Sequence, residues 1–307
     1  MKPISRRAVV LGALGCACVR AVPSIASAYE EVAEGIFIRS GLDEEATSDN
    51  DGAIANVGFI VGNESVAAWD AGGSLTDGKH LREAIRKQTK LPVRYVILTH
   101  AHPDHVFGTA AFLADKPEII GHAGLPNALA RRGEYYRARL ESKLGKSRAG
   151  TVIAPTRLVE KQLDINLGNR RLTLTAHPIA HTDNDLSALD QHTGTLLASD
   201  LLFVRRVPAL DGSLRGWLRE LRQLKALPAK RAVPGHGPAG VDWPTAADSL
   251  ERYLNVLLTE TRTAIAKGVP IERAVDVVGQ SERGRWALFD DYHGRNVTQA
   301  FKELEWE

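Results

Sequence analysis

The chain has 307 residues, of which 44% are apolar and 25% charged, so it is long enough to bury a sizeable core. This composition excludes a largely disordered chain, a collagen-like chain and a protein with several membrane spans. The formal net charge is +2. Without residues 1–28, which contain four cations and no acid, it is about −2, which gives no electrostatic reason to bind nucleic acid.

Residues 1–28 have the pattern of an export signal. Arg6 and Arg7 precede an apolar stretch, and residues 26–28 (ASA) match the small-x-small site of signal peptidase. Residues 5–11 (SRRAVVL) resemble a twin-arginine signal; the Sec pathway and a frayed N-terminal helix are the alternatives. Because the apolar stretch is too short to span a bilayer, we expect a periplasmic protein that begins near Tyr29 and has no stable membrane anchor.

Both cysteines, Cys16 and Cys18, lie within this predicted leader. The remaining chain can form no disulfide bond, so its stability must come from its core and from any bound metal. It also has no thiolate, which excludes cysteine hydrolases and sites with a Cys-bound zinc.

The first half of the remaining chain predicts strands and then helices. Strands are predicted at 35–39, 54–61 and 65–69, and the polar residues 40–52 predict a long loop, either a mobile flap or a surface excursion. A helix over 76–89, a buried strand over 93–98 and a short helix near 106–113 follow. The next predicted helix, over 124–145, is charged, and we interpret its cations as a solvated face: Arg131, Arg132, Arg137, Arg139 and Lys143.

The second half repeats this order. Strands are predicted at 172–176, 186–189 and 195–198, a helix over 214–227, a short strand at 231–233 and a mainly helical segment over 243–307. Three tryptophans, Trp69, Trp243 and Trp286, are expected in the core. Two packed sheets with outer helices fit this pattern, and so does an ordinary α/β layer.

Residues 100–105 (HAHPDH) place three imidazoles and a carboxylate directly after a predicted strand. His100 and His102 are two apart on an extended segment and can bind one metal ion, whereas Asp104 and His105 lie past the turn and can reach a second. Imidazole and carboxylate without thiolate suit zinc first, with iron or manganese as alternatives.

Three more candidate ligands, His181, Asp200 and His236, each follow a predicted strand, where side chains converge at one edge of a sheet. A lone histidine beside a strand is usually structural, but the shared placement favours ligands. His177 receives no ligand role, because Pro178 argues against a helix that would carry it on the same face as His181.

The order of these motifs resembles the metallo-β-lactamase superfamily across residues 30–240. The family pattern is Asp-x-Gly (here 70–72), H-x-H-x-D-H, a His, an Asp and a final Gly-His (here 235–236). The resemblance implies an αββα sandwich over residues 29–307, with its metals at the sheet edge and a helical C-terminal part. It also implies two zinc ions, with these residues around them: His100, His102 and His181 at the first, Asp104, His105 and His236 at the second, Asp200 bridging, and Asp70 fixing the ligand loop by hydrogen bonds.

The aspartate at position 200 excludes the β-lactamases with a Cys ligand there, and His102 argues against the flavodiiron oxidoreductases. A nuclease insertion is also missing, which leaves the glyoxalase II-like hydrolases. Within them the chain is most similar to the quinoprotein relay system zinc metallohydrolases, through its leader and residues 52–58 (GAIANVG), 211–217 (DGSLRGW) and 289–293 (FDDYH). This similarity implies a functional link to a quinoprotein dehydrogenase.

The resemblance implies hydrolysis of an ester, thioester, lactone or amide bond in a small organic substrate, by a hydroxide shared between two ions and oriented by Asp104. A true β-lactamase and a non-catalytic, metal-bound periplasmic accessory protein are the alternatives. Four acids of the predicted loop argue against a strongly anionic substrate unless they only solvate the loop: Glu44, Glu45, Asp49 and Asp51.

Overall fold

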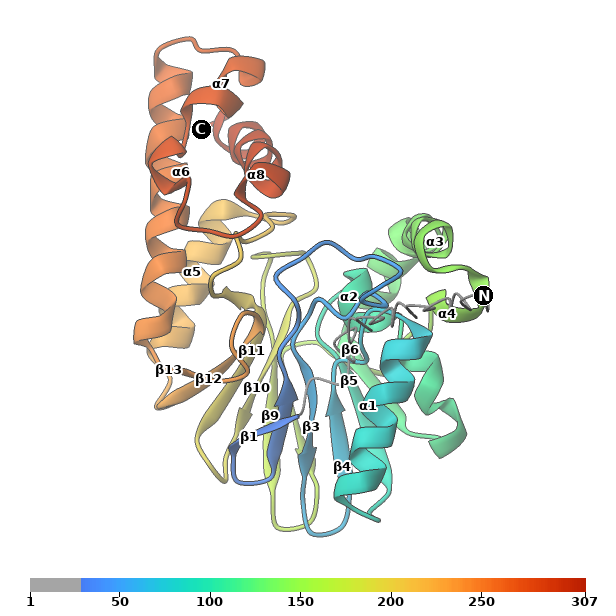
Figure 1. Cartoon of the computed structure of the whole chain (residues 1–307). Helices are drawn as coiled ribbons and strands as arrows, with labels where there is room; N and C mark the ends of the chain where they lie inside the picture. The colour runs from blue at the N-terminus through green and yellow to red at the C-terminus, as the bar shows by residue number, and fades with distance from the viewer. Residues whose placement is uncertain (1–28) are drawn as a thin grey trace, which may run out of the picture.

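Two β-sheets packed face to face form the centre of the molecule, and helices cover both outer faces (Figure 1). The computed structural model describes residues 29–307, so the predicted leader lies outside the described residues. The sandwich confirms the predicted αββα fold and removes the alternative of a single α/β layer. Within residues 29–307 we find no helix that combines the length and the apolar character needed to cross a membrane.

The first sheet holds seven strands in chain order, antiparallel from β1 to β4 and parallel from β4 to β7. Its strands are β1 (Glu30–Ala33), β2 (Ile36–Arg39), β3 (Val57–Val61), β4 (Val66–Trp69), β5 (Val93–Leu98), β6 (Glu118–His122) and β7 (Arg157–Val159). The helices on its outer face are α1 (Leu75–Gln88), α2 (Pro103–Val106), the 3₁₀-helix η1 (Thr109–Asp115), α3 (Leu125–Leu144) and α4 (Lys146–Ala149).

The second sheet has the strand order β13-β12-β11-β10-β9-β8, in which only β11 and β12 are parallel neighbours among the described strands. Its strands are β8 (Gln162–Asn166), β9 (Arg171–Ala176), β10 (Leu186–Asp190), β11 (Thr195–Phe203), β12 (Arg231–His236) and β13 (Val241–Asp242). Its outer face carries α5 (Leu214–Lys225), α6 (Asp248–Ala266), α7 (Ile271–Val277) and α8 (Phe289–Leu304), with short 3₁₀ turns η2 (Thr245–Ala247) and η3 (Gln280–Glu282).

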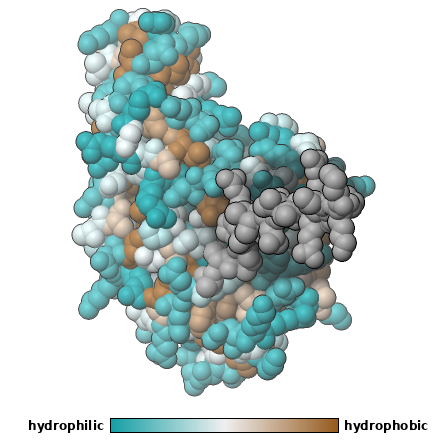
Figure 2. Space-filling view, viewed as in Figure 1, coloured by the Kyte–Doolittle hydropathy of each residue, from teal (hydrophilic) through white to brown (hydrophobic). Residues whose placement is uncertain are grey.

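Side-chain alternation along the strands divides the core into three layers. In β5, Ile97 points between the sheets, while Val96 and Leu98 pack under the helices of the first sheet. The layer on the other side joins β11 to α5 and the C-terminal helices through Trp217, Tyr253 and other buried side chains. Trp69, Trp243 and Trp286 are all buried, as predicted. The side of the molecule shown in Figure 2 is mostly hydrophilic, with small apolar areas among polar ones.

Three local predictions are wrong. The strand expected over 54–61 begins only at Val57, and the helix expected near 106–113 is instead α2 followed by η1. The surface excursion expected over 40–52 ends early, because residues 50–56 are buried. The side chain of Asn56 donates hydrogen bonds to the carbonyls of Pro234 and Pro238, so this loop is attached to the segment that carries His236.

Candidate metal centre

All seven predicted metal-binding side chains lie at one edge of the sandwich. His100 follows β5, His102 precedes α2, and Asp104 and His105 belong to α2. His181 lies between β9 and β10, and His236 ends β12. Asp200 lies inside β11, directly after Ser199, whose φ of 47° marks an irregularity in the pairing of β11 with β12. The fold therefore brings His100 and His236, which are 136 positions apart in the sequence, to the same edge of the sandwich.

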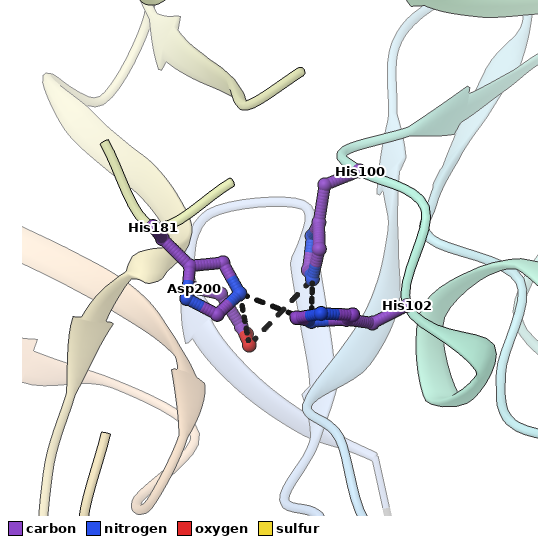
Figure 3. Close-up of side chains that lie close together, drawn as sticks. All are labelled: His100, His102, His181 and Asp200. Atoms are coloured by element: carbon purple, nitrogen blue, oxygen red, sulfur yellow. Dashed lines mark hydrogen bonds and ion pairs between the residues drawn. The ribbon is translucent and has the colours of Figure 1, made fainter. Parts of the chain in front are cut away.

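Three imidazoles and one carboxylate form the first group, shown in Figure 3. The Nδ1 of His102 lies 3.0 Å from the Nε2 of His100 and 3.1 Å from the Nε2 of His181. Asp200 Oδ2 lies 3.4 Å from the Nε2 of His181. Nitrogens about 2.0–2.1 Å from a tetrahedral zinc ion are about 3.3 Å apart, so this spacing fits three ligands of one ion.

Asp104, His105 and His236 form the second group. The Nε2 of His236 lies 3.3 Å from Asp104 Oδ2, and the Nε2 of His105 lies 3.7 Å from the same oxygen. Asp200 reaches this group as well, with Oδ1 3.2 Å from the Nε2 of His105. The two groups have the membership that the sequence predicted for two metal sites, with Asp200 in contact with both.

The outward nitrogen of every imidazole in the two groups has a hydrogen-bond acceptor. These pairs are His100 with Thr99 Oγ1, His102 with Asp211 Oδ2, His105 with Asp70 Oδ2, His181 with the Ala209 carbonyl and His236 with the Ile54 carbonyl, at 2.6–3.2 Å. Because each outward nitrogen donates its hydrogen, the inward nitrogen presents a lone pair to the centre.

Asp70 connects the two groups by hydrogen bonds, through Thr99 to His100 of the first group and directly to His105 of the second. Its carboxylate accepts hydrogen bonds from the Thr99 backbone N–H (2.9 Å) and hydroxyl (3.0 Å) and from His105 Nδ1 (2.8 Å). Since the Thr99 hydroxyl donates to Asp70, it is free to accept from His100. Asp70 is fully buried with a positive φ of 55°, a backbone strain typical of functional sites. It occupies the supporting position that the sequence predicted.

The donor set fits a pair of divalent cations. Both His105 Nε2 and Asp200 Oδ1 are buried and lack a hydrogen-bond partner among the described residues. Buried polar atoms without partners are costly, and a cation between them satisfies both. The ligand atoms are imidazole nitrogens and carboxylate oxygens, the types that suit zinc, iron or manganese.

Burial and mutual charge shift the pKa values of the metal-free cluster in opposite directions. Burial lowers the pKa of His100 well below its ordinary value and also lowers that of His181. Burial opposes the charged form of His105 too, but Asp200 and Asp70 raise its pKa well above the ordinary value. The pKa of Asp200 is well below its usual range despite burial, because His105 and His236 favour the carboxylate. Zinc binding must therefore displace protons from part of this cluster.

A pocket of about 600 Å³ opens onto both groups. Its walls come from the 40–56 loop, α3, α8 and the segment after β11. Four of the five cations of α3 are exposed, which agrees with the predicted solvated face, and they also line this pocket: Arg131, Arg132, Arg139 and Lys143. The fifth, Arg137, pairs with Glu134 and Glu141 away from the pocket.

Sequence reasoning gave no site role to Asp211, which the structure places against His102. Its Oδ2 lies 3.2 Å from His102 Nε2, and it also forms an ion pair with Arg132. In the sequence, residues 211–217 indicate only the similarity to the quinoprotein relay system zinc metallohydrolases. No local spacing links Asp211 to His102, which lies 109 positions earlier. His177 lies outside both groups, hydrogen-bonded to Ser187 (2.8 Å) and Glu220 (3.3 Å).

Comparison with known proteins identifies the family that the order of the site motifs resembles. The family model for the metallo-beta-lactamase superfamily matches residues 50–236. A linear primary-alkylsulfatase from Pseudomonas sp. is 22% identical over 216 residues, which are 58% of this chain and 40% of that protein. The chain thus spans well under half the length of this curated relative.

Solved structures show the same fold at low identity. TMB-1 is 18% identical with a TM-score of 0.58, covering 74% of this chain and 96% of that one. A metallo-beta-lactamase from Pontibacter korlensis is 19% identical with a TM-score of 0.59, covering 74% of this chain and 98% of that one. The chain belongs to the metallo-beta-lactamase superfamily.

Proposed function

We propose that this protein is a dinuclear zinc hydrolase that cleaves an ester, thioester, lactone or amide bond in a small organic substrate. One observation carries the proposal. Five imidazoles present their inward nitrogens to one centre while their outward nitrogens are all hydrogen-bonded, and the centre faces an open pocket. A closed structural zinc site needs no such opening, whereas a catalytic one keeps a position for water and substrate.

His100, His102 and His181 would hold the first zinc, and Asp104, His105 and His236 the second, with Asp200 reaching both. When bound, a zinc pair supplies a water-derived nucleophile at neutral pH and polarises the carbonyl of the substrate. Asp104 is the carboxylate of the cluster that faces the pocket most openly, with 15% of its side chain exposed. It is therefore placed to accept a proton or a hydrogen bond from the attacking group.

Asp200 supports the glyoxalase II-like assignment, because its carboxylate lies between the two groups of imidazoles, with Oδ2 3.4 Å from His181 and 3.5 Å from His236 and Oδ1 3.2 Å from His105. A sulfate ester is a further candidate bond. It is suggested by the alkylsulfatase relative and by the cations on the pocket wall.

The test is a substrate panel on the zinc-reconstituted full-length protein. It comprises a phenyl ester, an acyl thioester, a lactone, a chromogenic cephalosporin and an alkyl sulfate. We expect turnover of at least one non-lactam substrate that is abolished by a chelator and restored by zinc. Turnover of the cephalosporin alone would assign a β-lactamase. No turnover of any substrate by protein holding two zinc ions would favour the non-catalytic accessory role.

Export to the periplasm and a link to a quinoprotein dehydrogenase complete the proposal. Both rest on sequence motifs, namely residues 1–28 for export, and the same leader with residues 52–58, 211–217 and 289–293 for the link. N-terminal sequencing of the periplasmic protein should show a start at or near Tyr29. If export survives Arg6→Lys combined with Arg7→Lys, the twin-arginine route is wrong and the Sec route is favoured.

A further inference from the structure

We infer that the pocket binds its substrate through an anionic group, held away from the metal cluster by three basic side chains, Arg139 and Lys143 on α3 and Arg295 on α8. We call these three residues the anion clamp. This inference rests on the proposed function, since it names the substrate class of that site: a small molecule with an anionic group, an apolar segment and the bond to be hydrolysed.

The charge of the pocket wall is the first support. Six cations line the pocket: Arg131, Arg132, Arg139, Lys143, Arg206 and Arg295. Outside the metal cluster, three acids line it: Glu45, Asp211 and Asp291. The wall therefore has an excess of positive charge, although the body of the protein is slightly acidic. A concave site with one sign of charge attracts the opposite charge.

The clamp residues differ from the other cations of the wall in their ion pairing within residues 29–307. Arg131 pairs with Asp183, Arg132 with Asp211, and Arg206 lies 3.9 Å from Glu45. By contrast, no carboxylate within residues 29–307 forms an ion pair with any of the three clamp residues, so their charge is available to a ligand. Arg137, on the same helix but outside the pocket, pairs with two glutamates.

Helix geometry directs the clamp into the pocket. Arg132, Tyr136, Arg139 and Lys143 recur every three or four residues, so they share one face of α3, and all four line the pocket. On α8, the neighbouring pocket residues Asp291 and Arg295 are one turn apart. In Figure 1 these two helices lie on either side of the upper edge of the sandwich, where α2 carries Asp104 and His105 of the metal cluster.

Local contacts hold the clamp residues without consuming their charge. The guanidinium of Arg139 lies 5.8 Å from the ring centre of Tyr135, and that of Arg295 lies 5.9 Å from the ring centre of Tyr292. Arg139 Nη1 donates to the Tyr135 hydroxyl at 3.3 Å, and a guanidinium has five N–H donors, so further donors remain for an anion. Lys143 Nζ donates to the Ala46 carbonyl at 3.0 Å and keeps two further donors.

The acids of the 40–52 loop do not oppose this assignment, contrary to the sequence-based argument. Asp51 pairs with Arg148, and Glu45 accepts a hydrogen bond from the Tyr292 hydroxyl. Apolar side chains also line the pocket, among them Ile54, Phe203 and Leu210. The wall thus combines apolar side chains with its cations, which suits an amphiphilic anion.

The experiment is isothermal titration calorimetry on the full-length protein, both zinc-reconstituted and metal-free. The probes are hexanesulfonate, which has no hydrolysable bond, and hexyl methyl sulfone, its neutral counterpart. We expect hexanesulfonate to bind more tightly than the sulfone in both forms, and its affinity to fall with added salt. Each of Arg139→Gln, Lys143→Gln and Arg295→Gln should weaken it about tenfold, the loss expected for one charge-assisted contact.

Two control variants distinguish binding by the clamp residues from a general effect of the protein's charge. Arg137→Gln changes the same helix outside the pocket and should leave the affinity unchanged, whereas Asp291→Asn removes a wall acid and should tighten binding. Equal affinity for both probes overturns the inference, and so does binding that needs zinc and ignores the clamp variants. Since the calorimetry requires no turnover, clamp-dependent binding by a protein that fails the substrate panel would refute the hydrolase and leave the anion site standing.

Discussion

Replacing Asp200 by asparagine should weaken zinc binding more than any other isosteric change in the cluster. Asp200 is 3% exposed, and its two oxygens lie 3.2–3.7 Å from four imidazole nitrogens. Asparagine keeps the shape but offers one neutral oxygen, so no anion remains between the two cations. Changes one shell further out cost about 10–100-fold in metal affinity, or about 1.4–2.8 kcal/mol, and we take this as the lower bound.

The loss should be largest at the second site, because Asp200 Oδ1 lies 3.2 Å from the Nε2 of His105, closer than the other carboxylate there, Asp104 Oδ2, at 3.7 Å. Asp200 is also the strongest of the charges that raise the pKa of His105. The metal-free variant should therefore release fewer protons when zinc binds. Competition with a chelator measures the affinities of the two sites, and calorimetry in buffers of different ionisation enthalpy measures the protons.

His177→Ala is the control, because His177 is buried and hydrogen-bonded but lies outside both groups. It should lower stability while leaving two zinc ions bound. Our reasoning is refuted if Asp200→Asn binds both ions with wild-type affinity, or if His177→Ala loses one. Circular dichroism on both variants shows whether a lost ion reflects a lost fold.

Three further predictions concern the surroundings of the cluster. Asp211→Asn should lower zinc affinity at the first site about tenfold with little effect at the second, because Asp211 orients His102; equal losses at both sites would contradict this. Zinc affinity should rise with pH at pH values below the raised pKa of His105, since zinc must displace its proton there; a flat profile in a chelator competition would contradict this. In the metal-free protein the sign is opposite, because the stabilisation by protonated His105 is lost as pH rises through its raised pKa. Chelation should lower the melting temperature by about 5–10 °C, and an unchanged value would mean that the scaffold is stable without metal.

The sequence predicted most of the framework, because the signals are local. A six-residue motif placed three imidazoles and a carboxylate after a buried strand, and the positions after three later predicted strands supplied the rest. The placement of Asp200 after its strand was wrong, because β11 continues to Phe203 and contains Asp200. Five strands were not predicted: β1, β6, β7, β8 and β13. β7 and β8 are short with mostly exposed or half-buried residues, so their hydrophobic periodicity is weak, and β6 is a short apolar run beside the polar Glu118.

The support of the site could not be predicted, because its contacts join distant parts of the chain. Two outward nitrogens donate to backbone carbonyls, of Ala209 and Ile54, which leave no trace in side-chain pattern. The orientation of α3 is likewise set by tertiary packing. A charged helix sequence is compatible with a solvated face and with a pocket wall. Only the tertiary structure, in which residues of α8 line the same pocket, shows that α3 forms a wall of it.

The most direct test of the central claim is a crystal structure of the zinc-reconstituted protein with diffraction data collected on both sides of the zinc absorption edge. We predict two anomalous peaks per chain. One should lie among His100 Nε2, His102 Nδ1 and His181 Nε2, and the other among Asp104, His105 Nε2 and His236 Nε2, with Asp200 beside both. A single peak, or a peak bound by other side chains, would contradict the dinuclear hydrolase proposed here.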